Sequence, residues 1–156
     1  MALELPPPVQ AYLAAQQVMT LATQGSDGPW AAAVFYAELD ADLVFVSSPA
    51  SRHAGHLALD PRCAAAIHGP ADDWTSIRGV QLEGRVEPLN GAQRERAREC
   101  YGAKFPFARP ALAAPAIVEA LARVQWYRLC IARLLFIDNA RGFGKRRAFL
   151  ADPAGP

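Results

Sequence analysis

Short apolar runs separated by turn residues dominate the first third of the chain. The β-branched and apolar run at residues 18–23 is followed by turn residues at 25–29 and by a second apolar run at 30–39. Two aspartates mark a further turn at 40–42, before the apolar run at 43–48. Because consecutive strands joined by short turns pair as hairpins, these runs predict three antiparallel strands in succession.

The pattern then changes to that of a short helix. Ser48 or Ser51 can cap its start, Leu57 and Leu59 are expected to point inward, and Asp60 before a proline stops it. Apolar residues at helical spacing, or runs of good helix formers, predict three more helices. These helices cover residues 8–17, 91–102 and 116–124.

Strict alternation of apolar and polar residues is clearest at 76–89. Val80 and Leu82 are expected on one side of this strand, with Gln81 and Glu83 on the other. Further strands are predicted at 63–69, at 125–138 and, after a turn at 139–142, through residue 149.

The predicted elements give a mainly β fold with short helices. Six or seven mainly antiparallel strands favour a closed or partly closed barrel, because a small open sheet would leave long unprotected edges. The 156 residues suffice for one domain with a core of its own. Neither a repeat nor a linker divides the sequence, so residues 1–156 are expected to form a single domain.

Charge is distributed unevenly although the formal net charge is only +1. Residues 1–77 contain 2 arginines and 8 acidic residues, whereas residues 78–156 contain 14 basic and 7 acidic residues. The two halves are therefore expected to attract each other, and a generally basic nucleic-acid binder is not indicated. Arginine predominates among the basic residues, which suits carboxylate and phosphate binding; a GC-rich coding bias would give the same excess.

Cysteine usage and hydropathy indicate a cytoplasmic protein. Cys63, Cys100 and Cys130 are odd in number and widely spaced, as expected of reduced thiols. No run approaches the ~20 apolar residues of a membrane span, and the first ten residues lack the pattern of a signal peptide.

The residues around 46–53 offer the clearest chemistry. Hydroxyl groups, Arg52 and free backbone N–H groups converge at a helix start, where the helix dipole favours an anion such as phosphate. The alternative is a serine cap with Arg52 and His53 on the surface. His53 and His56 lack a carboxylate or cysteine partner in sequence, so two surface histidines are expected rather than a metal site. Three tryptophans, Trp30, Trp74 and Trp126, are expected to be packing anchors, with Trp74 the freest to stack on a ligand.

Several segments, in order, resemble the pyridoxamine 5'-phosphate oxidase-like split-barrel flavoproteins. They are TLAT at 20–23, AAAVFY at 31–36, LVFVSSPASRHAGHLALDPRCA at 43–64 and IRGVQLEGRVEPL at 77–89. The resemblance implies a six- to seven-stranded antiparallel split barrel and a homodimer that binds two FMN molecules at the subunit interface. The candidate cofactor-binding residues that the resemblance implies are Ala32, Ala33, Val34, Ser47, Ser48, Ser51, Arg52 and His53. The family's flavin-contacting glutamine aligns nearest Arg78 or Gly79 and not on Gln81, and Arg78 and Gln81 are the further candidates on that strand.

Two positions depart from the family pattern. His53 stands where a lysine or arginine is common, and apolar Phe35 and then Tyr36 stand where a basic residue often follows. The family's substrate-phosphate segment has no counterpart at 91–109, so pyridoxamine phosphate oxidase activity itself is not expected. The resemblance implies a flavin-dependent oxidoreductase that acts on a small molecule or a nicotinamide cofactor. Its alternatives are a carrier of flavin or of a tetrapyrrole such as haem, and a scaffold that has lost its cofactor.

The sequence DNARGFGKRRAF at 138–149 is the other concentrated feature. Arg141, Lys145, Arg146 and Arg147 surround two glycines that let a backbone come close to a ligand. This segment is expected either to reach a partner subunit's flavin or an anionic substrate, or to be a solvated hairpin. RGFG also matches the start of an RNA-recognition octamer, but Lys145 stands where an aromatic residue is needed. Neither nucleic acid nor membrane is expected as a partner.

Overall fold

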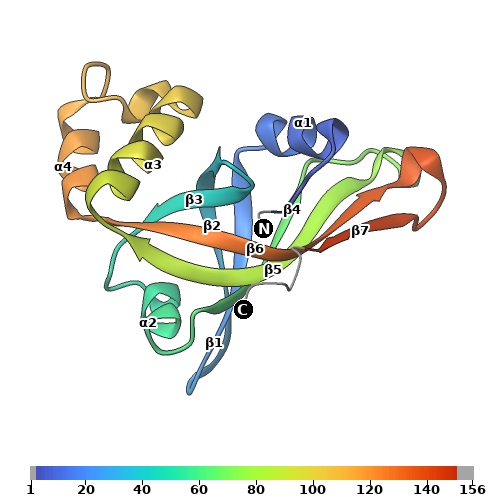
Figure 1. Ribbon diagram of the computed structural model, residues 1–156, viewed down its shortest axis with the longest axis horizontal. Helices are drawn as coiled ribbons and strands as arrows, with labels where there is room; N and C mark the ends of the chain where they lie inside the picture. Colours follow the sequence, from blue (N-terminus) through green and yellow to red (C-terminus); the bar gives the residue numbers. More distant parts are fainter. Residues whose placement is uncertain (1–2, 151–156) are drawn as a thin grey trace.

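Hydrogen bonds between neighbouring strands join the described chain into one sheet. The computed structural model describes residues 3–150, and its strand order is β3-β2-β1-β4-β5-β6-β7 (Figure 1). The strands are β1 Val18–Gly25, β2 Gly28–Leu39, β3 Asp42–Ser47, β4 Arg62–His68, β5 Arg78–Leu89, β6 Gln125–Asp138 and β7 Arg146–Leu150.

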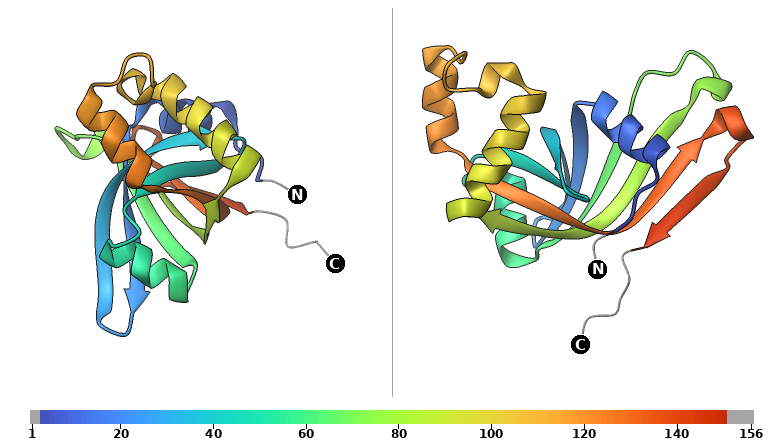
Figure 2. Two further views of the ribbon diagram at one scale, coloured as in Figure 1. Left: turned by 90° about the vertical axis from the view of Figure 1, so that its left-hand side faces the viewer. Right: turned by 45° about the horizontal axis from the view of Figure 1, so that its top comes forward.

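An additional pairing of β3 with β6 closes the first six strands into a barrel. All the paired neighbours are antiparallel, and β7 extends the sheet beyond β6 as a seventh strand. The predicted split-barrel fold is therefore confirmed, with β3 and β6, far apart in sequence, meeting along residues 43–47 and 125–129. Figure 2 shows the barrel with the β5–β6–β7 arm reaching away from it.

Four α-helices and three short 3-10 turns fill the connections. The helices are α1 Pro7–Ala15, α2 Arg52–Leu59, α3 Gly91–Lys104 and α4 Pro115–Arg123, and the turns are η1 Trp74–Ser76, η2 Pro106–Ala108 and η3 Asn139–Arg141. Figure 1 shows α3 and α4 together at one end of the molecule and the β7 arm at the other. Within the described chain, no helix is long and apolar enough to cross a membrane.

The core fills the barrel and continues beneath α3. Tyr36, Phe45, Leu129 and Leu134 are fully buried inside the barrel, as the alternation in the strands requires. A second buried cluster on the outer side joins α3 to the sheet. Its members are Ala37, Leu39, Val44, Leu89, Ala97, Tyr101, Phe105 and Trp126.

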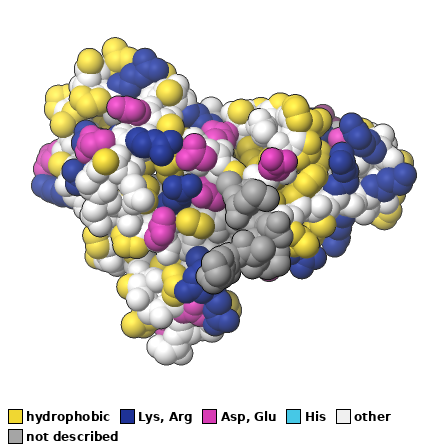
Figure 3. Space-filling view, in the orientation of Figure 1, with side chains coloured by type: hydrophobic (Ala, Val, Ile, Leu, Met, Phe, Trp, Pro, Cys, Tyr) yellow, Lys and Arg dark blue, Asp and Glu magenta, His cyan; other side chains and the backbone are white. Residues whose placement is uncertain are grey.

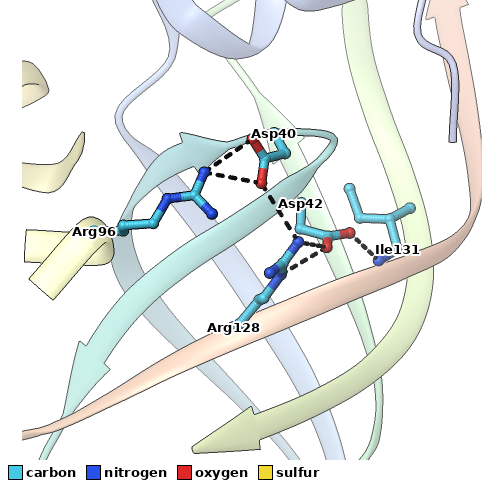
Figure 4. Close-up of polar contacts among 5 residues, drawn as sticks. All are labelled: Asp40, Asp42, Arg96, Arg128 and Ile131. Atoms are coloured by element: carbon cyan, nitrogen blue, oxygen red, sulfur yellow. Dashed lines mark hydrogen bonds and ion pairs between the residues drawn. The ribbon is translucent and has the colours of Figure 1, made fainter. Parts of the chain in front are cut away.

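Ion pairs between the acidic and basic halves brace the barrel closure, as the charge distribution predicts. Asp42 at the start of β3 accepts hydrogen bonds from Arg128 Nε at 2.7 Å and from the backbone N–H of Ile131 at 2.9 Å (Figure 4). Asp40 in the preceding turn pairs with Arg96 of α3 at 3.3 Å. Since Asp42 and Arg128 are mostly buried, this pair is less screened by water than a surface pair.

A β-bulge bends β6 where it crosses β5. Glu83 pairs with Arg133 and Gly84 with Ile131, so one residue of β6, Ala132, has no partner on β5. A Cβ atom on Gly84 would overlap the carbonyl oxygen of Cys130. The close approach of the two backbones therefore requires glycine at this position.

Some details differ from the sequence predictions. Leu59 is 84% exposed, so its predicted inward position is wrong; α2 instead buries Ala54, His56 and Leu57. The third helix runs through Lys104, two residues beyond its predicted end. The alternation predicted for β5 is confirmed: Val80 and Leu82 are buried, while Gln81 and Glu83 are exposed.

Candidate functional site

Hydroxyl groups gather where β3 ends and α2 begins. Ser51 is the N-cap of α2, and its Oγ accepts a hydrogen bond from the backbone N–H of Ala54 at 3.3 Å. The same hydroxyl donates to the carbonyl oxygen of Ser48 at 2.8 Å. Ser48 is exposed, whereas Ser47 is buried at the end of β3. Of the two serines that could cap α2 by sequence, Ser51 is therefore the N-cap.

His53 links the two ends of this serine cluster. Its Nε2 lies 2.6 Å from Ser47 Oγ and 3.3 Å from Ser51 Oγ. Burial, and secondarily the charge of His56, lower the pKa of His53 below its ordinary value. The imidazole is therefore neutral near pH 7, so it offers a hydrogen bond to an anion rather than a full charge.

Arg52 extends from the first turn of α2 toward the β1–β2 hairpin. Its Nη2 donates to the carbonyl oxygen of Asp27 at 3.0 Å, and its guanidinium lies 4.4 Å from the centre of the Trp30 ring. Arg52 Nε is 2.8 Å from Asp27 Oδ2, close enough for an ion pair, but its N–H is buried and misaligned for a hydrogen bond. Trp30 is thus a partner for Arg52, not the buried packing anchor that the sequence predicts.

Part of the hydrogen-bonding capacity at this helix start is unused. Among the described residues, Arg52 Nη1 and the backbone N–H groups of Arg52 and His53 have no hydrogen-bond partner. Arg52 is 35% exposed at its side chain, so water or a ligand can reach it. Free N–H groups at a helix N-terminus beside a guanidinium are a favourable environment for a phosphate group.

A buried histidine fixes the position of Asp27. His56 Nε2 lies 2.6 Å from Asp27 Oδ1, and its Nδ1 lies 3.0 Å from Thr23 Oγ1. Because a carboxylate can only accept, Nε2 donates, and this bond together with Arg52 lowers the pKa of Asp27. His56 is 7% exposed at its side chain, so the predicted surface position is wrong. No sequence signal links His56 to Asp27, 29 residues away.

A small-residue face lies on the outside of the barrel. We define it by the exposed residues of β1, β2 and β4 that pair across the strands: Thr20, Ala22, Ala31, Ala33, Ala64 and Ala66. A shallow depression of about 370 Å³ borders it and reaches Gln81 of β5. Among the candidate residues of β2, Ala33 belongs to this face, and Ala32 and Val34 are half-buried neighbours.

The structure places the candidate cofactor residues of this part of the chain in two groups. Arg52 contacts Trp30, and Ala32 to Val34 follow Trp30 along β2 at about 7–13 Å. Gln81 lies on the same outer surface as Ala33, in the row of paired residues that also contains Thr20 and Ala66. Ser47, Ser48, Ser51, Arg52 and His53 gather at the start of α2. Trp30, which Arg52 contacts, shares its side of β2 with Ala32 and Val34.

Arg78 lies apart from both groups. It pairs with Asp138 at the last residue of β6, whereas Ser47 pairs with Gln125 at the first, roughly 40 Å away along the strand. Its guanidinium lies 5.3 Å from the centre of the Tyr12 ring. Within one chain, Arg78 therefore does not share a site with Arg52.

Phe35, which stands where the family often has a basic residue, is surrounded by other aromatic rings. Its ring centre lies 5.3 Å from that of Phe105 and 6.0 Å from that of Phe107, although 44% of the residue is exposed. The basic residue common at this position would have to lie among these rings. An aromatic cluster between β2 and the segment after α3 therefore occupies the position of the family's basic residue.

Comparison with known proteins identifies relatives of the whole barrel. The family model described as pyridoxamine 5'-phosphate oxidase matches residues 5–137. The UPF0306 protein YhbP of Escherichia coli is 32% identical over 145 residues, which cover 91% of this chain and 90% of that protein.

Two solved structures share the fold. A haem-binding protein from Mycobacterium smegmatis superposes with a TM-score of 0.72 at 25% identity, over 94% of this chain and 59% of the other. An FAD-binding protein from Mesorhizobium loti superposes with a TM-score of 0.61 at 21% identity, over 86% of this chain and 96% of the other.

Proposed function

The chain belongs to the pyridoxamine 5'-phosphate oxidase family, and on this premise we propose that it binds FMN and works as a flavin-dependent oxidoreductase. The observation that carries the proposal is the unused hydrogen-bonding capacity at the start of α2, beside Arg52. A phosphate there leaves the rest of the cofactor to follow the backbone of Ala32, Ala33 and Val34 in β2, of which only the small side chain of Ala33 is exposed.

FMN supplies the chemistry of accepting and passing on a hydride or electrons. The protein's residues bind and orient it. Arg52 and the N–H groups of α2 hold the phosphate, and Ser48 and His53 add hydrogen bonds. His56, through Asp27, holds the Arg52 side chain in place. The Mesorhizobium loti protein of the same fold binds FAD, which supports a flavin on this barrel.

Titration of the purified protein with FMN, followed by flavin fluorescence and absorption, tests the proposal. We expect saturable quenching with one FMN per chain, and catalytic bleaching of the flavin bands by reduced nicotinamide under anaerobic conditions. A protein that neither carries flavin nor changes the FMN spectrum would refute it. Slow, stoichiometric bleaching would instead indicate a flavin carrier.

A haem carrier is the second candidate, because the Mycobacterium smegmatis protein that superposes over 94% of this chain binds haem. Parallel titration with haemin separates the two. A sharpened Soret band with tighter binding of haemin than of FMN would favour the haem carrier, whereas competition won by FMN would favour the flavoprotein.

We further propose that two copies of the chain associate through the small-residue face. This face is exposed and consists of small side chains, mostly alanine, and its Ala33 lies three residues along β2 from Trp30, the partner of Arg52. A second copy would cover a ring lying on it, and Arg78 could approach the Arg52 site only from another chain. The half of the chain richer in arginine would then contribute to the partner's site.

Ala66→Arg is expected to convert the dimer to a monomer. The substitution places a charge within the small-residue face, and an uncompensated buried charge costs about 3 kcal/mol or more, roughly a hundredfold in affinity. Light scattering after size-exclusion chromatography measures the mass. Ala120→Arg, on the exposed part of α4, is the matched control and should remain dimeric. A monomeric wild-type protein with FMN bound would contradict the association.

A further inference from the structure

A cavity lies between α3 and α4, at the end of the molecule opposite the β7 arm (Figure 1). Its volume is about 720 Å³, within the ~300–1,000 Å³ typical of small-molecule sites. Residues of both helices and of the segment that connects them line it, together with the buried Trp126 of β6. None of the residues proposed to hold FMN lines this cavity.

Apolar side chains of α4 and of the residue that follows it face the cavity. Val118, Leu121 and Val124 line it, and no residue of α4 is buried, although Ile117, Val118 and Leu121 give the helix an apolar side. An amphipathic helix normally buries its apolar side against the rest of the protein. Part of this side borders open space instead, so a ligand with an apolar body can complete the packing.

The α3 side of the cavity is charged. Arg94 and Arg98 both lie near the carboxylate of Glu95, at 3.3 Å and 3.6 Å. Glu99 also lines the cavity, and none of the ion pairs among residues 3–150 includes it. Figure 3 shows apolar (yellow) and charged side chains next to one another at this end of the molecule, in the upper left of the view. The cavity therefore combines an apolar wall with a charged one.

Arg109, in the segment between the two helices, is the cation that is left for a ligand. Its Nε donates to the carbonyl oxygen of Gly102 at 2.7 Å, whereas its Nη1 and Nη2 have no partner among the described residues. A Cβ on Gly102 would lie 3.2 Å from Arg109 Cγ, so glycine lets this side chain lie close against α3. The guanidinium is thus held in place before a ligand arrives, and its outer N–H groups can hold a carboxylate.

The cavity and the serine cluster of α2 lie on opposite faces of the β3–β6 pair. Ser47 pairs with Gln125, and Val46 pairs with Trp126. Because successive side chains of a strand point to opposite faces, Trp126 reaches the cavity from the face opposite to that of Ser47. The sheet therefore separates a ligand in the cavity from the start of α2.

We propose that the cavity between α3 and α4 binds a small monocarboxylate with an apolar body. The carboxylate accepts hydrogen bonds from Arg109, and the apolar body packs against Val118, Leu121 and Val124. Glu99 lines the same cavity and repels a second negative charge, so a phosphate monoester or a dicarboxylate is a poorer fit. This site is separate from the one proposed for FMN, and its test does not require the flavin.

Calorimetric titration of the full chain with straight-chain carboxylates tests the proposal. We expect saturable binding whose affinity rises about fourfold for each CH₂ group added between hexanoate and decanoate, because a buried CH₂ contributes about 0.8 kcal/mol. Decanedioate, which has the same length but carries a second carboxylate, should bind roughly tenfold or more weakly than decanoate, since that carboxylate would lie among apolar side chains.

Two pairs of variants locate the binding site. Arg109→Gln removes the cation and Val118→Asp places a carboxylate in the apolar wall, and each should weaken decanoate binding roughly tenfold or more. Arg123→Gln and Leu112→Asp are the matched controls, because they make the same changes at positions that do not line the cavity. All four positions are exposed, so all four variants should fold, and the controls should bind decanoate like the wild-type protein.

Four results would overturn the assignment. The wild-type protein does not bind decanoate, or its affinity does not change with chain length. The control variants lose as much affinity as Arg109→Gln and Val118→Asp. Displacement of decanoate by one equivalent of FMN would make the cavity part of a flavin site. A fall from dimer to monomer mass in Val118→Asp, with decanoate affinity unchanged, would show that a second copy covers α4 instead.

Discussion

Arg52→Ala is expected to weaken FMN binding by about 1.5–3 kcal/mol, roughly 10- to 150-fold, the range for a hydrogen bond to a charged group. Arg52 has an unpaired Nη1 beside the free N–H groups of α2, so an incoming phosphate can accept a hydrogen bond from it. Isothermal titration calorimetry or flavin fluorescence measures the affinity.

Two variants make this measurement specific. Arg52→Lys keeps the charge but not the forked geometry and should bind FMN with intermediate affinity. Arg62→Ala removes an exposed arginine just beyond α2, where its partner is Asp60, and should bind FMN like the wild-type protein. Unchanged FMN affinity in Arg52→Ala would show that the phosphate lies elsewhere.

Gly84→Ala is expected to lower the free energy of unfolding by about 3 kcal/mol, at the upper end for overpacked sites. The added methyl group would overlap backbone atoms of Cys130 in the neighbouring strand, and a backbone cannot move aside as a flexible side chain can. Urea denaturation with an unchanged m-value measures the loss.

Gly55→Ala is the matched control for Gly84→Ala. Gly55 is exposed within α2, and a Cβ there meets no atom within 4 Å. Alanine favours a helix over glycine, so this variant should gain about 0.5–1 kcal/mol. A Gly84→Ala protein as stable as the wild type would mean that the bulge in β6 accepts a side chain.

Local patterns suffice for the elements of this fold but not for every contact between them. The alternation at 76–89 places Val80 and Leu82 inside because strand side chains alternate with a period of two. Hairpin turns pair β1 with β2 and β2 with β3. The closing pair of β3 and β6, by contrast, joins residues more than 75 positions apart, and it could be inferred only from the need to protect sheet edges.

The candidate site shows the same division. Ser51 and Arg52 are recognisable from sequence because caps and helix starts have local signatures. Asp27, Thr23 and the burial of His56 are not, since a hairpin turn and a short helix come together only in the folded chain. Leu59 was misplaced for a related reason: α2 buries a polar histidine where an apolar residue is expected.

The affinities of the purified protein for FMN and for riboflavin, measured side by side, test the central claim most directly. The two ligands share the ring system and differ in the phosphate. If the start of α2 holds that phosphate, FMN should bind roughly a hundredfold more tightly than riboflavin, and Arg52→Ala should remove most of the difference. Equal affinities for FMN and riboflavin in the wild-type protein would contradict the account.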